Sequence, residues 1–214
     1  MSADLFQGFL SNNGAEFGKL SGKKVVQNYG DLVAEHRYLT QKVALIDLTS
    51  RGAMAALGDD RVKYINGQVT NEVMGLRPGQ GCYAALVNVK AKMQSDLNIY
   101  RLEDELILDL EPGQFEVVKT RLERNIVSDQ VELVDVSPHF GLLSLQGPDT
   151  CGLLESIGFS LPVEPLSHNK VSTPNMGEWF LIHNSRFGSI GCDLYIPIEY
   201  LPVAAEYLFK NTLK

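Results

Sequence analysis

The stretch from Arg61 to Arg101 changes its hydrophobic period part-way, and this change constrains the fold more than any other feature of the chain. Before Pro78 the apolar residues recur at helical spacing, and afterwards they alternate with polar residues, as in half-buried strands. The Pro78-Gly79 pair marks a turn between the two patterns. We therefore predict a helix followed by a hairpin of two strands. The hairpin carries one carboxylate, Asp96, which suggests a ligand site built on it.

The rest of the chain lacks the strand–helix–strand rhythm of a parallel sheet. Asp59 is expected to cap the helix before the hairpin, and residues 158–177 are expected to form a loop. The remaining helices are expected at 5–12, 31–40, 115–125, after 149 and at 201–209, and the remaining strands at 43–47, 52–57, 105–110, 131–136, 142–146, 178–183 and 191–197. These elements predict an α+β fold with antiparallel sheets. No linker of low complexity divides the chain, so we expect two fused lobes rather than two independent domains.

Composition excludes several classes of function. The net charge of -7 argues against nonspecific binding to nucleic acid, which needs clustered basic residues. An anionic ligand would need local basic groups, which Lys90, Lys92 and Arg101 would supply unless they only keep the hairpin soluble. No apolar run reaches the roughly 18 residues of a membrane span, and the N-terminus lacks the pattern of a signal peptide. We therefore expect a cytoplasmic protein that does not bind membranes.

The potential metal ligands are scattered along the chain. The cysteines at 82, 151 and 192 are far apart and show neither zinc spacing nor a disulfide framework, so we expect reduced, mostly structural thiols. None of the four histidines stands four residues from another. The sequence therefore predicts no metal site.

Five blocks of sequence resemble one family, the glycine cleavage T-protein (aminomethyltransferase) family with its folate-binding relatives, including those that support iron-sulfur enzymes. The central block is "GQVTNEVMGLRPGQGCYAALVN", followed by Asp96-Leu97. The others, in the family's order, are "VVQNYGDLVAEH", "VALIDLTSRG", "LSLQGPDT" and "GCDLYIP". The resemblance implies that residues 1–214 form a folate-binding region of two α+β lobes, with tetrahydrofolate in the cleft between them. One lobe would comprise about 1–57 and 131–214, and the other about 58–130.

The resemblance assigns the catalytic role to Asp96. T-proteins carry a carboxylate at this position, beside the folate nitrogen that attacks the one-carbon unit. A carboxylate there can accept a hydrogen bond from the N–H group, raise the nucleophilicity of the nitrogen and stabilise the cationic iminium character that develops. The alternative is an exposed strand carboxylate that serves only as a hydrogen-bond acceptor.

Four further residues are implied to bind the folate. Asp193 stands where T-proteins carry a glutamate that binds the pterin ring; here the side chain is one methylene shorter, and a surface role on its strand is the alternative. Tyr29 and Tyr83 are candidates to wall the cleft and stack against flat rings, although a tyrosine is often simply packed in a core. Asn71 is a candidate donor to ligand carbonyls, and it also suits a helix end.

The chain also departs from the T-protein pattern. Ala91-Lys92 replaces paired glycines, Ser95 replaces a second aspartate, and Arg186-Phe187-Gly188-Ser189 replaces a loop of the Tyr-Thr-Gly-Glu type. T-proteins continue with a folate-contacting arginine and a C-terminal β-barrel domain, whereas this sequence stops at Lys214. We therefore expect either a fragment or a short family member, in which a homodimer would complete the cleft wall.

Two classes of function follow. The first is an aminomethyltransferase-like enzyme that transfers a one-carbon unit to tetrahydrofolate, with a lipoyl carrier protein as its partner. The second is a folate-binding regulatory or iron-sulfur-maintenance module, for which tetrahydrofolate is only a ligand. A non-catalytic interaction domain that binds no folate is the remaining alternative.

Overall fold

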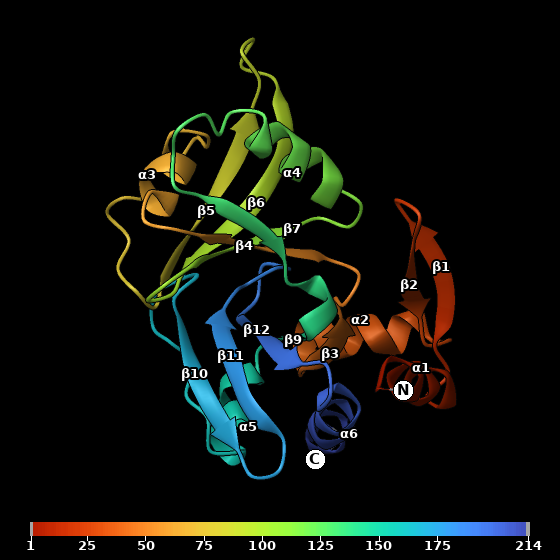
Figure 1. Ribbon diagram of the computed structural model, residues 1–214. Helices are drawn as coiled ribbons and strands as arrows, with labels where there is room; N and C mark the ends of the chain where they lie inside the picture. Colours follow the sequence, from red (N-terminus) through yellow and green to blue (C-terminus); the bar gives the residue numbers. More distant parts are fainter. Residues whose placement is uncertain (1, 213–214) are drawn as a thin grey trace. The chain divides into compact units, whose positions relative to one another are not determined.

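The computed structural model describes residues 2–212, which form six α-helices and twelve strands (Figure 1). These residues divide into two compact units. One comprises residues up to Ser50, Pro138–Pro165 and the residues from Asn169 onwards; the other comprises Arg51–Ser137 and Leu166–His168. The helices are α1 (Ser2–Asn12), α2 (Leu32–Gln41), α3 (Arg61–Asn66), α4 (Phe115–Glu123), α5 (Thr150–Ser156) and α6 (Leu201–Thr212). The fold is α+β, as predicted.

The first unit is built on a sheet of order β10-β11-β12-β9-β3. Its strands are β3 (Ala44–Asp47), β9 (Phe140–Gln146), β10 (His168–Thr173), β11 (Gly177–His183) and β12 (Gly191–Pro197). Strand β9 lies between β3 and β12 and pairs antiparallel with both. Alternate residues of β9 and β12, such as Leu145 and Leu194, enter one apolar core, in which the fully buried Trp179 is the largest side chain.

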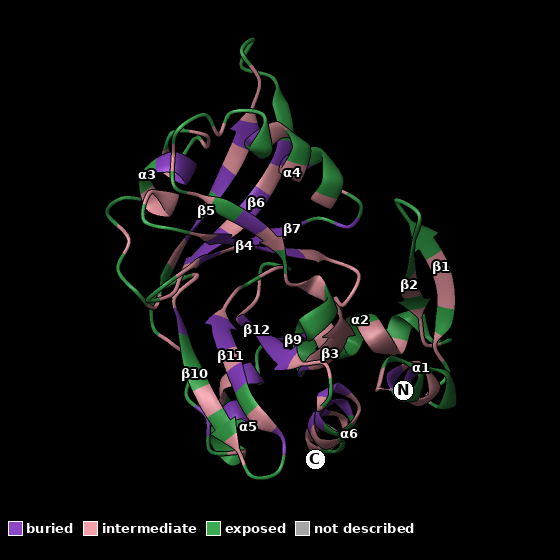
Figure 2. Cartoon of the chain, viewed as in Figure 1, coloured by how far each residue is buried: buried purple, intermediate pink, exposed green. Residues whose placement is uncertain are grey.

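Helices α1 and α6 pack together and contribute to this core. On α6 the buried residues recur at helical spacing, as Leu201, Ala204, Ala205 and Leu208. Helix α2 behaves differently, because none of its residues is buried (Figure 2). Its start is fixed locally instead: the side chain of Asp31 accepts hydrogen bonds from the backbone N–H groups of Val33 and Ala34.

The second unit contains a sheet of order β5-β6-β7-β4-β8. Its strands are β4 (Gly52–Leu57), β5 (Gln80–Val87), β6 (Met93–Arg101), β7 (Leu106–Leu110) and β8 (Glu132–Asp135), and all of their pairings are antiparallel. The predicted hairpin is confirmed, because β5 and β6 pair along their length. One face of the sheet packs against α3 and α4 to form the core, with Leu97, Ile99 and Leu108 among its buried residues.

Several sequence predictions about elements were wrong. The N-cap position of helix α3 is held by Asp60 rather than Asp59, without a capping hydrogen bond from its side chain, and the helix ends at Asn66. The carboxylate of Asp60 instead accepts a hydrogen bond from the backbone N–H of Gln130, at 2.9 Å. Strand β10 lies in the predicted loop, and β1 (Glu16–Leu20), which pairs with β2 (Lys23–Asn28), was not predicted. Neither β1 nor β10 shows a regular alternation of buried and exposed residues: β1 has no buried residue, and in β10 only His168 is buried. Both strands therefore lack a clear apolar pattern.

Strands β4 and β8 pair with each other in the second unit, although we expected both in the first lobe from the sequence. The role of the units as folate-binding lobes stays a prediction. No helix among residues 2–212 is long and apolar enough to span a membrane.

Candidate functional site

The face of the second sheet opposite its apolar core carries a group of polar side chains on β5, β6 and β7. Alternation along the strands places Tyr83, Asp96, Asn98 and Asp109 on this face. The strand register aligns three of them in a row across β5, β6 and β7, because Tyr83 pairs with Asn98 and Asn98 pairs with Asp109. Asp96 lies two residues before Asn98 on the same strand. This face therefore collects the polar groups of three strands.

The predicted catalytic residue, Asp96, is partly buried and interacts with Tyr83. The Tyr83 hydroxyl donates a hydrogen bond of 2.9 Å to Oδ2 of Asp96. This hydrogen bond is the main reason why the pKa of Tyr83 is raised, so the phenol remains a donor at neutral pH. The side chain of Tyr83 is 53% exposed. Among residues 2–212, no group donates a hydrogen bond to the other oxygen of Asp96, so that oxygen can accept one from a ligand.

Asn71 lies beside this pair but uses its own side chain locally. Its amide nitrogen donates to the backbone oxygen of Tyr83 at 2.9 Å, and its amide oxygen accepts from the backbone N–H of Glu72 at 2.8 Å. These contacts hold the loop after α3 against β5. The structure therefore brings together three of the five predicted site residues, Asn71, Tyr83 and Asp96.

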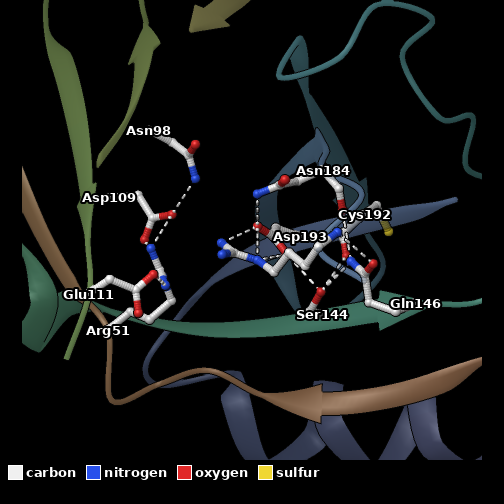
Figure 3. Close-up of polar contacts among 10 residues, drawn as sticks. Arg51, Asn98, Asp109, Glu111, Ser144, Gln146, Asn184, Cys192 and Asp193 are labelled. Carbon is white, nitrogen blue, oxygen red and sulfur yellow. Dashed lines mark hydrogen bonds and ion pairs between the residues drawn. The ribbon is translucent and has the colours of Figure 1, made fainter. Parts of the chain in front are cut away.

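A second polar cluster on this face was missed by the sequence analysis (Figure 3). Arg51 holds the carboxylate of Asp109 with two of its nitrogens, at Nε–Oδ1 2.7 Å and Nη2–Oδ2 3.1 Å, and it also forms an ion pair with Glu111. Asn98 donates to Oδ2 of Asp109 at 3.0 Å. Asp109 is fully buried. An acidic residue within the apolar strand Leu106–Leu110 was the available signal, because a buried carboxylate requires partners.

Asp193 lies in the first unit, at the centre of another polar network (Figure 3). Arg186 donates from Nη2 to Oδ2 at 2.6 Å and from Nε to both carboxylate oxygens. Ser144 donates to Oδ1 at 2.7 Å, and Asn184 donates to Oδ2 at 2.8 Å. Asp193 is fully buried, and its carboxylate is saturated by the chain's own donors.

Gln146 supports the loop that carries Arg186. Its Oε1 accepts the backbone N–H of Arg186 at 3.0 Å, and its Nε2 donates to Ser144 and to the backbone oxygen of Asn184. Gly191 leaves space for this side chain, because an added Cβ there would lie 2.2 Å from Oε1 of Gln146. The network thus has its own supporting residues.

Tyr29 is partly buried in the first unit and packs against the apolar core. Burial, together with the nearby carboxylates of Asp47 and Glu35, raises the pKa of Tyr29 to about 12. Burial also raises the pKa of Asp47, while its hydrogen bond from Thr49 opposes that change. Tyr29 is therefore a neutral phenol in an acidic setting.

The basic groups suggested by the sequence have different surroundings. Arg101 donates to the backbone oxygen of Leu76 at 2.6 Å, which ties it to the turn before β5. Lys90 and Lys92 are exposed at the turn between β5 and β6, where their backbone N–H groups donate to the side chain of Asn88. Within residues 2–212, no group of three or more acidic, cysteine or histidine side chains is arranged to hold a metal ion.

Comparisons with known proteins agree with the fold. The chain is 28% identical over 198 residues to an aminomethyltransferase of Desulforamulus reducens, covering 87% of this chain and 52% of the relative. It is 26% identical over 145 residues to an aminomethyltransferase of Thermus thermophilus, covering 67% of this chain and 42% of the relative. The crystal structure of the glycine cleavage system aminomethyltransferase T from Bartonella henselae matches with a TM-score of 0.82 and 22% identity, over 98% of this chain and 56% of that one.

The chain thus spans about half the length of the curated relatives it matches. The family model described as the GCVT N-terminal domain matches residues 6–212. That match covers nearly the whole sequence and confirms the resemblance found in the five sequence blocks. The chain belongs to the family of the GCVT N-terminal domain.

Proposed function

We propose that this chain binds tetrahydrofolate and takes part in one-carbon transfer to it from an aminomethyl carrier, with Asp96 as the key carboxylate. The relatives named above are aminomethyltransferases, and the family model covers residues 6–212. Tetrahydrofolate is a substrate in this proposal. The carrier partner would be a lipoyl-bearing protein that presents the aminomethyl group.

The proposal rests on the hydrogen bonding of the Asp96 carboxylate. Tyr83 fixes one oxygen at 2.9 Å, and the other oxygen remains available as an acceptor on the polar face of the sheet. A carboxylate held in this way can accept an N–H group of the folate and orient its nitrogen toward the one-carbon unit. It would also stabilise positive charge that develops during transfer. Tyr83 would position the carboxylate, and Asn71 would hold the strand that carries Tyr83.

Asp193 is proposed to contact the pterin, but this contact requires that some of its present hydrogen-bond donors are displaced. A carboxylate can accept paired hydrogen bonds from the amino and ring N–H groups of a pterin. The oxygens of Asp193 already accept from Arg186, Ser144 and Asn184, so a pterin would have to replace some of these donors. Tyr29 is proposed to contact the ligand from its partly buried position. The proposed function depends on Asp96 more than on Asp193 or Tyr29.

Calorimetric titration of the purified chain with tetrahydrofolate and 5-formyltetrahydrofolate tests the proposal. We expect saturable binding that is at least several-fold weaker in Asp96→Asn. The matched control is Asp104→Asn, which changes an exposed carboxylate in the turn between β6 and β7 and should bind like the parent. Absence of binding by the parent, or equal binding by Asp96→Asn, would contradict the proposal.

Turnover separates transfer from binding alone. The parent chain would be incubated with tetrahydrofolate and an aminomethyl-loaded lipoyl carrier, and ammonia release would be measured. Transfer that is lost in Asp96→Asn and retained in Asp104→Asn is the expected result. Binding without ammonia release would instead indicate the alternative, a folate-binding module that does not complete the transfer.

A further inference from the structure

We propose that Asn98 is a further ligand-binding residue of the site that carries Asp96, and that Asp109 and Arg51 aim its carbonyl oxygen at the ligand. This inference rests on the proposed function, because it assumes that the ligand lies against Asp96 and Tyr83. It adds a second acceptor to the site, on a residue that was not among the sequence candidates.

The position of Asn98 follows from the strand register. Asn98 pairs with Tyr83 across the hairpin and lies two residues after Asp96 on β6. Alternate residues on a strand point to the same face and stand about 7 Å apart. Asn98 is partly buried, so a ligand that contacts Asp96 and Tyr83 would pass within reach of it.

The orientation of the Asn98 amide is set by its other neighbour. An amide has a donor end and an acceptor end, whereas a carboxylate only accepts hydrogen bonds. Asp109 therefore draws the amide nitrogen, which donates to its Oδ2 at 3.0 Å. The carbonyl oxygen of Asn98 is turned away from Asp109 (Figure 3). Within residues 2–212, no group donates a hydrogen bond to that oxygen.

Arg51 stabilises this orientation of the Asn98 amide, because it fixes the carboxylate of Asp109. Its guanidinium contacts both oxygens of Asp109, in the two-pronged geometry that suits a carboxylate. The guanidinium is also paired with Glu111. Because Asp109 is fully buried and held in this way, its carboxylate cannot rotate without losing charged hydrogen bonds. Arg51 and Asp109 are thus positioning residues, and Asn98 is the residue that contacts the ligand.

The two acceptor oxygens of Asp96 and Asn98 favour ligands that donate hydrogen bonds at this position. Asp96 and Asn98 would present two acceptors along one strand, so the ligand portion bound here carries N–H groups rather than carbonyl oxygens. Reduced folates have N–H donors on the ring system and on the amide of the aminobenzoyl group. A ligand that offers an acceptor to Asn98 would leave two oxygens facing each other and would bind less well.

Four variants test this inference with 5-formyltetrahydrofolate as the calorimetric probe. Asn98→Ala removes the acceptor and should weaken binding about two- to twelvefold, the range expected for one lost hydrogen bond. Asp109→Asn leaves Asn98 in place but replaces the carboxylate, which only accepts hydrogen bonds, with an amide that has a donor end, so the Asn98 amide should no longer be held in one orientation. Binding should weaken by a similar factor.

The double variant Asn98→Ala/Asp109→Asn distinguishes an effect of Asp109 on the orientation of the Asn98 amide from a general effect on the structure. If Asp109 acts through Asn98, the change Asp109→Asn should cause no further loss of affinity in the Asn98→Ala background. Equal losses in both backgrounds would overturn the positioning role. Asn98→Leu, which is close to asparagine in size, replaces these variants as the test if Asp109→Asn does not fold, and it should weaken binding as Asn98→Ala does.

The outcomes distinguish this inference from the proposed function. If the parent chain does not bind the probe, the proposed function itself fails. If the parent binds and Asp96→Asn is weakened, but Asn98→Ala and Asn98→Leu bind like the parent, only the inference about Asn98 is overturned.

Discussion

The hydroxyl of Tyr83 donates a 2.9 Å hydrogen bond to the carboxylate of Asp96 across two adjacent strands. The two residues are diagonal neighbours, because Tyr83 pairs with Asn98 and Asp96 pairs with Ala85. A long tyrosine side chain can bridge such a diagonal on one face of a sheet. The contact leaves one oxygen of Asp96 for a ligand and restricts the rotation of the carboxylate.

Tyr83→Phe tests this relationship directly. Removal of the hydroxyl should leave stability within about 0.5 kcal/mol of the parent, because Tyr83 is 53% exposed and water can replace the lost partner. Folate affinity should fall several-fold, since Asp96 loses its orientation. Urea denaturation would measure the first quantity and calorimetry the second. A large loss of stability would show that the hydroxyl is structural, and unchanged affinity would remove Tyr83 from the proposed site.

Asp193→Ala should be strongly destabilising, whatever its effect on ligand binding. The variant leaves Arg186 without the carboxylate that accepts from it at 2.6 Å, and a broken buried ion pair typically costs about 3–5 kcal/mol. The double variant Asp193→Ala/Arg186→Met should recover part of the loss, because no uncompensated charge remains. Denaturant unfolding of the single and double variants measures both effects. A single variant as stable as the parent would contradict the importance of this pair.

Tyr83 and Asp96 were predicted from the family resemblance, and they lie on one face because the short hairpin that carries them pairs in a single register. Sequence reasoning did not find the Arg51–Asp109 pair, whose members are 58 residues apart and lie on opposite sides of a long connection. The pairing of β4 with β7 is set by tertiary packing rather than by a turn, and no local pattern encodes it. Asp193 was identified, but its saturation by Arg186 depends on the conformation of a loop.

Gly147→Ala should destabilise the first unit. Gly147 has a φ of 135°, and an added Cβ would lie 2.2 Å from the backbone oxygen of Lys42, which cannot move like a side chain. We expect a loss of about 2 kcal/mol or more from backbone strain and displaced packing. Gly152→Ala is the matched control: it lies in α5 with no atom within 4 Å of the added Cβ, and alanine favours a helix by about 0.5–1 kcal/mol. Thermal unfolding should therefore shift in opposite directions in the two variants.

Tyr29 should make stability fall at alkaline pH. Burial and the nearby carboxylates of Asp47 and Glu35 raise its pKa from 10.0 to about 12 in the folded chain. Below pH 10 the phenol is protonated in both the folded and unfolded states, so its contribution is fully present there. As the pH rises towards about 12, the unfolded state loses the proton first, and the contribution is lost as the pH passes through the folded pKa. Stability at alkaline pH should therefore fall more steeply in the parent than in Tyr29→Phe.

Urea denaturation of the parent and Tyr29→Phe across this pH range isolates the residue, because all other titrating groups are common to both chains. Tyr38→Phe is the matched control, because it removes the same hydroxyl from an exposed tyrosine on α2. The same slope in the parent and Tyr29→Phe would show that neither burial nor the carboxylates of Asp47 and Glu35 raise the pKa of the phenol. A shallower slope in Tyr29→Phe alone would place Tyr29 in an acidic, partly dehydrated environment, where a flat neutral ring would be favoured over an anion.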